Sequence, residues 1–241
     1  NYDDTKNGDN SLEEGITMLT SNILTVLKHY DCEKFIFFSS AKIYGEPSLS
    51  KNQIFYENTN PEPVSDYGKQ KLKAEKMIIA HANKSNLKYL IYRLPMVYGI
   101  GSNSNVNKLL KFIEKSYPFI LFRNTNHLMK SLISIENIKL YVRHNIQNLD
   151  SIQNNIFNIT DKENICLNEL ITEHKRISNS NTFIIFMPYF FLKLFVRIPL
   201  FGNYFLKLFG QLEISNKDIN DTYKIICKDT HSCIAEMNLN E

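Results

Sequence analysis

The chain has 241 residues, of which 43% are hydrophobic and 22% charged, and its formal net charge is +3. These values predict one globular unit, or two tightly coupled lobes, with a sizeable core, and the small charge argues against nucleic acid as a partner. Four cysteines without paired metal-ligand spacing predict no metal site and reduced thiols, as in a cytoplasmic protein.

The first predicted elements are a helix over about residues 11–30 and a strand over 35–38. The strand is continuously apolar, a pattern typical of a strand buried on both faces of a parallel sheet. It ends on Ser39 and Ser40. Open α/β sheets bind ligands at the carboxyl ends of their strands, so these two hydroxyls are candidate site residues.

A loop with several turn residues leads to Ser65, a predicted N-cap, and to a helix that carries Tyr67 and Lys71. Residues four apart lie on one helix face. The spacing Y-x-x-x-K alone is weak evidence, because it also occurs at Tyr2/Lys6, Tyr30/Lys34 and Tyr189/Lys193. Only Tyr67 and Lys71 follow a buried strand that ends in Ser-Ser-Ala, so an ordinary surface role is favoured for the other pairs.

The Tyr67 and Lys71 pair predicts a definite chemistry. A phenol with a pKa of about 10 is a poor base at neutral pH, but a nearby ammonium group and a helix N-terminus favour the phenolate. Tyr67 could then take a proton from an alcohol or sugar hydroxyl while Ser40 binds the same oxygen. The remaining requirement is a hydride acceptor.

Further along, strands are predicted at 87–92 and 119–122, with an amphipathic helix between them that starts near Asn105. A strand and helix pair follows within 156–171. Residues 183–210 are strongly aromatic, yet prolines and charges interrupt them before the roughly 20 apolar residues of a membrane-spanning helix accumulate. We expect a strand and helices there. The alternative is a weak membrane-surface contact with Lys193, Arg197 and Lys207 over anionic headgroups.

Three runs carry a family resemblance: SSAKIYG at 39–45, SDYGKQKLKAE at 65–75 and YRLPMVYGIG at 92–101. They resemble the extended short-chain dehydrogenase/reductase superfamily, within it the nucleotide-sugar epimerases, dehydratases and 4-keto reductases. The resemblance implies an α/β fold with a partial Rossmann-like, doubly wound parallel sheet. It assigns 1–100 to the carboxyl-terminal part of the NAD(P)-binding domain and 101–241 to a smaller α/β substrate-binding lobe.

The same resemblance implies roles for single residues and partners. The catalytic set is Ser40, Tyr67 and Lys71. The cofactor, NAD or NADP, would contact Ser39, Tyr67, Lys71, Pro95 and Val97. A nucleotide sugar, with a UDP-sugar as the expected substrate, would contact Ser40, Asn105, Lys130 and Lys207; a homodimer is a further expectation.

Some of these positions depart from the family pattern. Lys130 and Lys207 stand where the family has arginine, which replaces a bidentate fork by a point charge. Asn105 has the alternative role of a plain helix cap.

The larger departure concerns the cofactor site. A dinucleotide-binding unit needs a first strand, a glycine-rich turn and a helix N-terminus, and none of these occurs in the 241 residues. The resemblance therefore covers the carboxyl-terminal two-thirds of an enzyme. We expect a truncated chain rather than a cofactor-less variant, and poor dinucleotide binding by this chain alone.

The residues after Ser40 separate the reaction classes. They are Ala41 and Lys42, where sugar 4,6-dehydratases have Asp-Glu, so dehydration is disfavoured. C4 epimerisation and 4-keto-sugar reduction, for surface polysaccharide synthesis, both stay open. The competing hypothesis is a non-catalytic remnant or interaction module that has lost cofactor binding. A steroid or flavonoid-type reductase ranks last, because it would need an apolar pocket.

Overall fold

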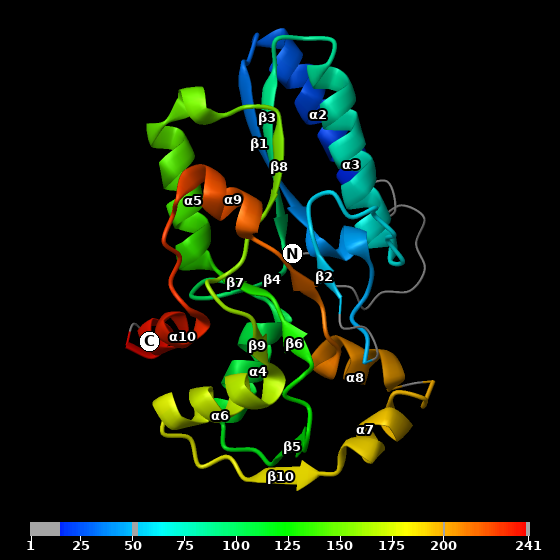
Figure 1. The fold of residues 1–241 in the computed structure, drawn as a ribbon, viewed down its shortest axis with the longest axis vertical. Coiled ribbons are helices and arrows are strands. Elements are labelled where there is room, and N and C mark those ends of the chain that lie inside the picture. Colours follow the sequence, from blue (N-terminus) through cyan, green and yellow to red (C-terminus); the bar gives the residue numbers. More distant parts are fainter. Residues whose placement is uncertain (1–14, 50–52, 200, 240–241) are drawn as a thin grey trace.

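The computed structural model describes residues 15–49, 53–199 and 201–239 of the chain. At its centre, three parallel strands form a sheet in the order β1-β3-β8 (Figure 1). They are β1 (Lys34–Ser40), β3 (Lys88–Leu94) and β8 (Asn155–Asn158). Aromatic and branched apolar residues fill β1 and β3 and favour a packed, pleated surface. The predicted α/β class with a Rossmann-like parallel sheet is confirmed.

Helices cover both faces of this sheet (Figure 1). On one side lie α2 (Gly15–His29) and α3 (Asp66–Ala82), and on the other lies α5 (Ile135–Gln147). The start of α3 confirms the predicted cap, because the Ser65 side chain accepts a hydrogen bond from Gly68 N at 3.4 Å. The part of the first predicted helix before Gly15, and the Tyr2/Lys6 pair, fall outside the described residues.

The expectation that β1 is buried on both faces is wrong. None of its apolar residues, Phe35 to Phe38, is fully buried. Within the described residues β1 also pairs only with β3, so it is an edge strand of the sheet. Phe38 is 37% exposed. The helix α5 leaves the surface beside β1 open, and a cavity of about 500 Å³ lies there, lined by Phe38 and by Ile138, Val142 and Ile146 of α5.

Most of the other elements form a smaller unit, which lies below the sheet in Figure 1. Two strands, β4 (Met96–Tyr98) and β7 (Leu132–Ser134), pair in parallel and connect it to the sheet. Its other strands are β5 (Phe119–Phe122), β6 (Met129–Lys130), β9 (Ile165–Cys166) and β10 (Ile184–Met187). Its helices are α4 (Asn105–Glu114), α6 (Leu167–Ile177), α7 (Tyr189–Phe195) and α8 (Gly202–Phe209).

The remaining elements cross between the two parts. They are the short helices η1 (Ala41–Tyr44) and η2 (Leu149–Ser151), the paired strands β2 (Ile54–Phe55) and β11 (Glu213–Ile214), and the helices α9 (Lys217–Tyr223) and α10 (Thr230–Leu239). Because β8 follows the smaller unit's first strands and still joins the central sheet, the chain crosses back between the parts. The domain boundary near residue 100 stays a prediction.

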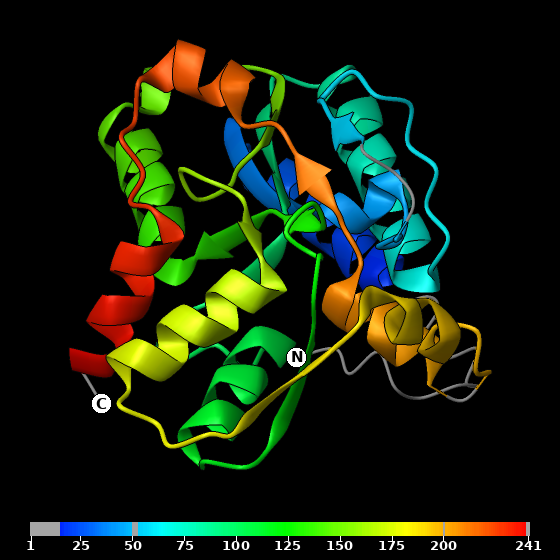
Figure 2. The ribbon, with the colours of Figure 1, turned by 60° about the horizontal axis from the view of Figure 1, so that its bottom comes forward.

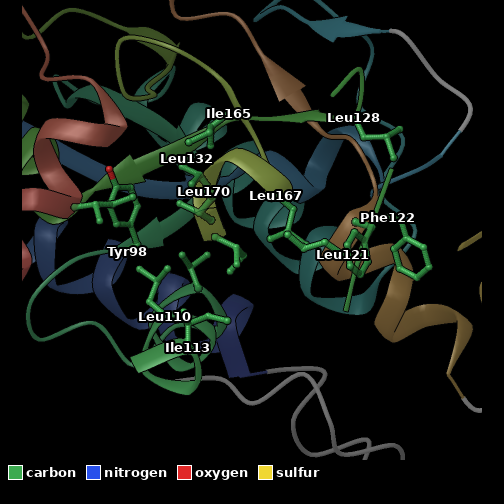
Figure 3. Packing of buried hydrophobic residues seen from close by; sticks show 14 of the residues in the cluster. Tyr98, Leu110, Ile113, Leu121, Phe122, Leu128, Leu132, Ile165, Leu167 and Leu170 are labelled. Carbon is green, nitrogen blue, oxygen red and sulfur yellow. The ribbon is translucent and has the colours of Figure 1, made fainter. Parts of the chain in front are cut away.

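The core of the smaller unit forms where α4 and α6 pack on β5 and β7 (Figure 3). The inner face of α4 presents Val106, Leu110 and Ile113, all at most 6% exposed, at helical spacing. Phe122 of β5 is fully buried, with the Phe209 ring edge-on at 4.9 Å. The aromatic segment 183–210 thus supplies a strand and two helices, as predicted.

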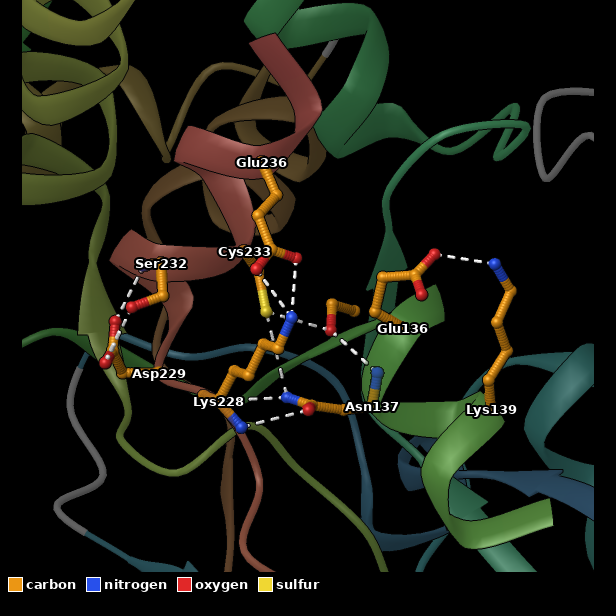
Figure 4. Close-up of polar contacts among 9 residues, drawn as sticks. Glu136, Asn137, Lys139, Lys228, Asp229, Ser232, Cys233 and Glu236 are labelled. Atoms are coloured by element: carbon orange, nitrogen blue, oxygen red, sulfur yellow. Dashed lines mark hydrogen bonds and ion pairs between the residues drawn. The ribbon is translucent and has the colours of Figure 1, made fainter. Parts of the chain in front are cut away.

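The carboxyl-terminal tail is fastened to α5 by polar contacts (Figure 4). Asn137 exchanges two hydrogen bonds with the backbone of Lys228, at 2.9 and 3.0 Å. The Lys228 ammonium binds both carboxylate oxygens of Glu236 at 2.5 and 2.7 Å. These hydrogen bonds hold the carboxyl-terminal segment against α5.

The buried carboxylate of Asp161 also contacts α5 and the carboxyl-terminal part of the chain. Asp161 is fully buried and accepts hydrogen bonds from Tyr98 Oη, Ser134 N, Asn137 Nδ2 and Thr230 Oγ1, at 2.6 to 3.0 Å. Burial raises the pKa of Asp161, and the four donors oppose that rise. A buried carboxylate with this many donors is well satisfied and fixes β4, α5 and α10 relative to one another.

Candidate functional site

The predicted site residues of the sheet gather at one edge. In the β1–β3 register Ser39 lies opposite Arg93 and Ser40 opposite Leu94, so Pro95 follows directly beside the end of β1. Val97 comes next, in β4. The carboxyl ends of the two strands therefore bring Ser39, Ser40 and Pro95 together, as the sequence predicts for a ligand site.

The two serines have different environments. Ser40 is 9% exposed and caps η1, where its Oγ accepts a hydrogen bond from Lys42 N at 3.2 Å. Ser39 Oγ is buried and has no hydrogen-bond partner among the described residues. Buried hydroxyls are normally paired, so an orphaned one at a strand end suits a ligand atom.

Two ammonium groups lie close to the Tyr67 ring. Lys71 Nζ is 5.8 Å from the ring centroid and Lys42 Nζ is 5.5 Å from it. Lys71 Nζ also donates to the Phe38 carbonyl of β1 at 2.8 Å, which ties α3 to the strand. Burial lowers the pKa of Lys71, and the charge of Glu75 partly opposes this. The structure thus brings Tyr67 and Lys71 to the edge that carries Ser39 and Ser40.

Gly68 explains how α3 comes so close to η1. A Cβ at this position would lie 2.6 Å from the carbonyl oxygen of Lys42 and 3.2 Å from Pro63 Cβ. Only a residue without a side chain permits this approach. Tyr67 therefore reaches the end of β1 because its neighbour in the chain is glycine.

A buried ion pair fixes the same helix against the sheet. Arg93 of β3 binds Glu75 of α3 through two hydrogen bonds, at 2.8 and 3.1 Å, and both residues are at most 4% exposed. Arg93 also donates to Tyr44 Oη at 2.8 Å, and Tyr44 in turn donates to Asn158 Oδ1 at 2.9 Å. The network joins η1, α3, β3 and β8, so it positions the helix that carries Tyr67.

Three of the four predicted substrate-binding residues lie in the smaller unit. Asn105 is exposed in the first turn of α4, and the cap of that helix is Ser104, so the alternative of Asn105 as the cap is wrong. Lys130 is 3% exposed and donates to the backbone carbonyl of Lys207 at 3.0 Å. Burial lowers the pKa of Lys130 to about 7. The structure therefore joins Lys130 with Lys207 and places Asn105 on α4.

Sequence reasoning missed Lys42, Gly68 and Asn107 as site residues. Asn107 is buried and holds the turn after β4, since its side chain binds Gly99 N, Gly99 O and Ser102 O at 2.6 to 3.0 Å. No local pattern identifies such contacts.

Among the described residues no group of His, Cys, Asp and Glu could hold a metal ion, and no helix is both long and apolar enough to cross a membrane.

Known proteins resemble this chain in sequence and in fold. The model of the NAD dependent epimerase/dehydratase family matches residues 4–159. A UDP-glucose 4-epimerase of Vibrio cholerae is 29% identical over 192 residues, which is 79% of this chain and 57% of the relative. The chain thus spans a little over half of that curated relative.

Two solved structures show the same fold. UDP-glucose 4-epimerase of Thermotoga maritima, solved with UDP-glucose, has a TM-score of 0.72 at 19% identity over 94% of this chain and 69% of that one. UDP-glucuronic acid 4-epimerase of Bacillus cereus, in complex with NAD, has a TM-score of 0.69 at 20% identity over 92% of this chain and 65% of that one. At this identity the likeness shows the fold alone.

Proposed function

Because the chain belongs to the NAD-dependent epimerase/dehydratase family, we propose that it is the catalytic and sugar-binding part of an enzyme acting at C4 of a nucleotide sugar. The supporting observation is that the Lys71 and Lys42 ammonium groups lie 5.8 and 5.5 Å from the centroid of the Tyr67 ring, near the strand end that carries Ser40. We assign the base to Tyr67, the second oxygen contact to Ser40 and charge stabilisation to Lys71.

These residues would move one proton. Tyr67 Oη takes the proton of the C4 hydroxyl, and Ser40 Oγ hydrogen-bonds the same oxygen while it becomes a carbonyl. For this Tyr67 starts as the phenolate, which the two ammonium groups near its ring favour, and the transferred proton returns it to the neutral phenol. Lys42 adds to Lys71 in this role. NAD or NADP, when bound, supplies the hydride acceptor and donor.

The residues at the end of β1 fit the nicotinamide end of the cofactor. The buried Ser39 hydroxyl has no partner among the described residues, and Lys71, Pro95 and Val97 lie at the same edge. The pyrophosphate end has no such fit, because the 241 residues contain no glycine-rich turn. We propose that a segment outside this chain supplies that turn and packs on the open edge of β1, beside the cavity of about 500 Å³.

We propose a UDP-sugar as the substrate. The V. cholerae relative is named for UDP-glucose, and the T. maritima structure contains it. Asn105, Lys130 and Lys207 would contact the diphosphate, and Lys130 Nζ would have to leave the Lys207 carbonyl to do so. A role in surface polysaccharide synthesis and a homodimer stay predictions.

The first test is Tyr67→Phe. The variant is made in a polypeptide that also carries the proposed glycine-rich segment, because this chain spans only 57% of the relative's length. We expect turnover of UDP-galactose to UDP-glucose to fall by about 10²-fold or more, while binding of the nucleotide sugar persists. The matched control is Tyr30→Phe, which has the same Y-x-x-x-K spacing and should keep full turnover. Full turnover in Tyr67→Phe would remove Tyr67 from the base role.

Cofactor consumption separates the two reactions. An epimerase returns the hydride to the carbon that lost it, so the nicotinamide absorbance is unchanged after many turnovers. A 4-keto-sugar reductase consumes one NAD(P)H per turnover. A complete polypeptide that neither binds NAD(P) nor turns over a sugar would favour the alternative of a non-catalytic remnant.

A further inference from the structure

Large apolar side chains are exposed from β10 to the start of α8. Eight of them fall within residues 183–204: Phe183, Ile185, Phe186, Phe190, Leu194, Ile198, Phe201 and Tyr204. Single exposed apolar residues are ordinary, whereas a concentration of them indicates an interaction surface.

Other residues of the same helices already supply the core. Phe195, Phe205 and Phe209 surround Phe122 of β5, with ring centroids 6.1, 6.3 and 4.9 Å away. Leu192 of α7 is fully buried as well. The outward residues are therefore not needed to close the core of the smaller unit.

The outward residues of α7 and the following turn form an apolar stripe: Phe190, Leu194, Ile198 and Phe201. The first three are spaced four residues apart, so they lie along one side of the helical segment. They are 66%, 46% and 38% exposed, and Phe201 is 57% exposed. A helix whose apolar residues point both to the core and to solvent is unusual for a protein surrounded by water.

Cations run beside this stripe. Lys193 and Arg197 are exposed and also four residues apart, in a row next to Phe190 and Leu194. Two further exposed cations lie on neighbouring elements: Arg123 directly follows β5, where its backbone N–H donates to the Met187 carbonyl of β10 at 2.8 Å, and Lys207 lies on α8. No Asp or Glu occurs between residues 174 and 212. Figure 2 shows α7 and α8 together at one side of the molecule, away from α5 and α9.

We propose that the apolar stripe and its cations dock on the surface of an anionic phospholipid bilayer, with α7 lying along the headgroups. Apolar side chains beside Lys and Arg are the chemistry of an interfacial helix, and lipid headgroups supply the negative charge that this segment lacks. A second copy is a poorer occupant. A two-fold contact through the stripe would bring Lys193 and Arg197 against the same residues of the other copy.

The test is flotation with lipid vesicles. The 241-residue chain is mixed with vesicles of phosphatidylcholine alone, or of phosphatidylcholine and phosphatidylglycerol in equal parts, and centrifuged through a density gradient. We expect flotation only with the anionic vesicles, reduced by added salt. Phe190→Ser/Leu194→Ser and Lys193→Gln/Arg197→Gln should each weaken binding about tenfold or more.

Matched controls lie outside the stripe. Leu149→Ser/Ile226→Ser removes two other exposed apolar residues, and Lys84→Gln/Lys115→Gln removes two other exposed charges. Both control variants should float as the unaltered chain does. The midpoint temperature of thermal unfolding should be the same in all variants. Absence of flotation with anionic vesicles would overturn the proposal. So would equal binding in all variants, or a dimer in sedimentation that the double serine variant abolishes without any effect of lipid.

Discussion

Lys130 places an ammonium group in the protein core, and this has a consequence for stability. Its pKa falls from 10.5 in the unfolded chain to about 7 when folded, because burial removes water from the charge. Between these two values the unfolded state holds a proton that the folded state lacks. The contribution of Lys130 to the free energy of unfolding should therefore become more favourable as pH rises from about 7 to about 10.5.

Lys130→Met tests this reasoning. It removes a buried charge and keeps most of the side-chain volume, so we expect an increase of the free energy of unfolding on the order of 2–4 kcal/mol at pH 7 and below. The gain should shrink as pH rises toward the unfolded pKa. Urea unfolding across this pH range measures it, with the exposed Lys84→Met as control. Equal destabilisation at every pH would contradict the prediction.

Some site residues could be recognised from the chain alone, and others could not. Ser40, Tyr67 and Lys71 could be recognised because a strand end and a helix start are local patterns. Lys42 reaches the Tyr67 ring only through the packing of η1 on α3, and Asn107 acts through buried contacts with the turn after β4. These contacts depend on tertiary structure, which no local spacing encodes.

At the scale of the elements, the packing of α3 against η1 requires the absence of a side chain at Gly68. Alanine normally favours a helix over glycine by about 1 kcal/mol. At Gly68, however, the added Cβ would lie 2.6 Å from the Lys42 carbonyl. The clash should outweigh the gain in helix propensity.

We therefore expect Gly68→Ala to lower the free energy of unfolding by about 1–3 kcal/mol, as other overpacked sites do. It should also move Tyr67 away from Ser40 and reduce turnover of the complete enzyme. Thermal unfolding and turnover are the measurements. The exposed Lys69→Ala in the same helix is the control and should change neither. A Gly68→Ala protein that is more stable than the unaltered one would show that α3 can shift without cost.

The β1 strand shows where element-level prediction failed. Its apolar run identified the strand and its parallel pairing, since both depend on the residues within it. Burial on both faces depends on what surrounds the strand, and in the described part of the chain no second strand pairs with β1 and Phe38 is exposed. Element identity was therefore predictable, whereas burial was not.

Across the whole molecule, the open edge of β1 and the missing glycine-rich turn lead to one prediction about cofactor binding. The 241-residue chain should bind NAD weakly, and a longer polypeptide that joins the proposed glycine-rich segment to it should bind NAD at least 10²-fold more tightly. Calorimetry on both forms measures the difference. Equal affinity in the two forms would show that this chain holds the cofactor by other means.

The one-sided pairing of β1 also determines how its backbone exchanges hydrogen with solvent. Alternate N–H groups of a strand point to opposite neighbours, so those of β1 that face β3 are protected by the ladder. Those on the other side meet no strand within the described residues. In heavy water the two sets should separate into slow and fast deuterium uptake, and the fast set becomes slow wherever another strand completes the sheet.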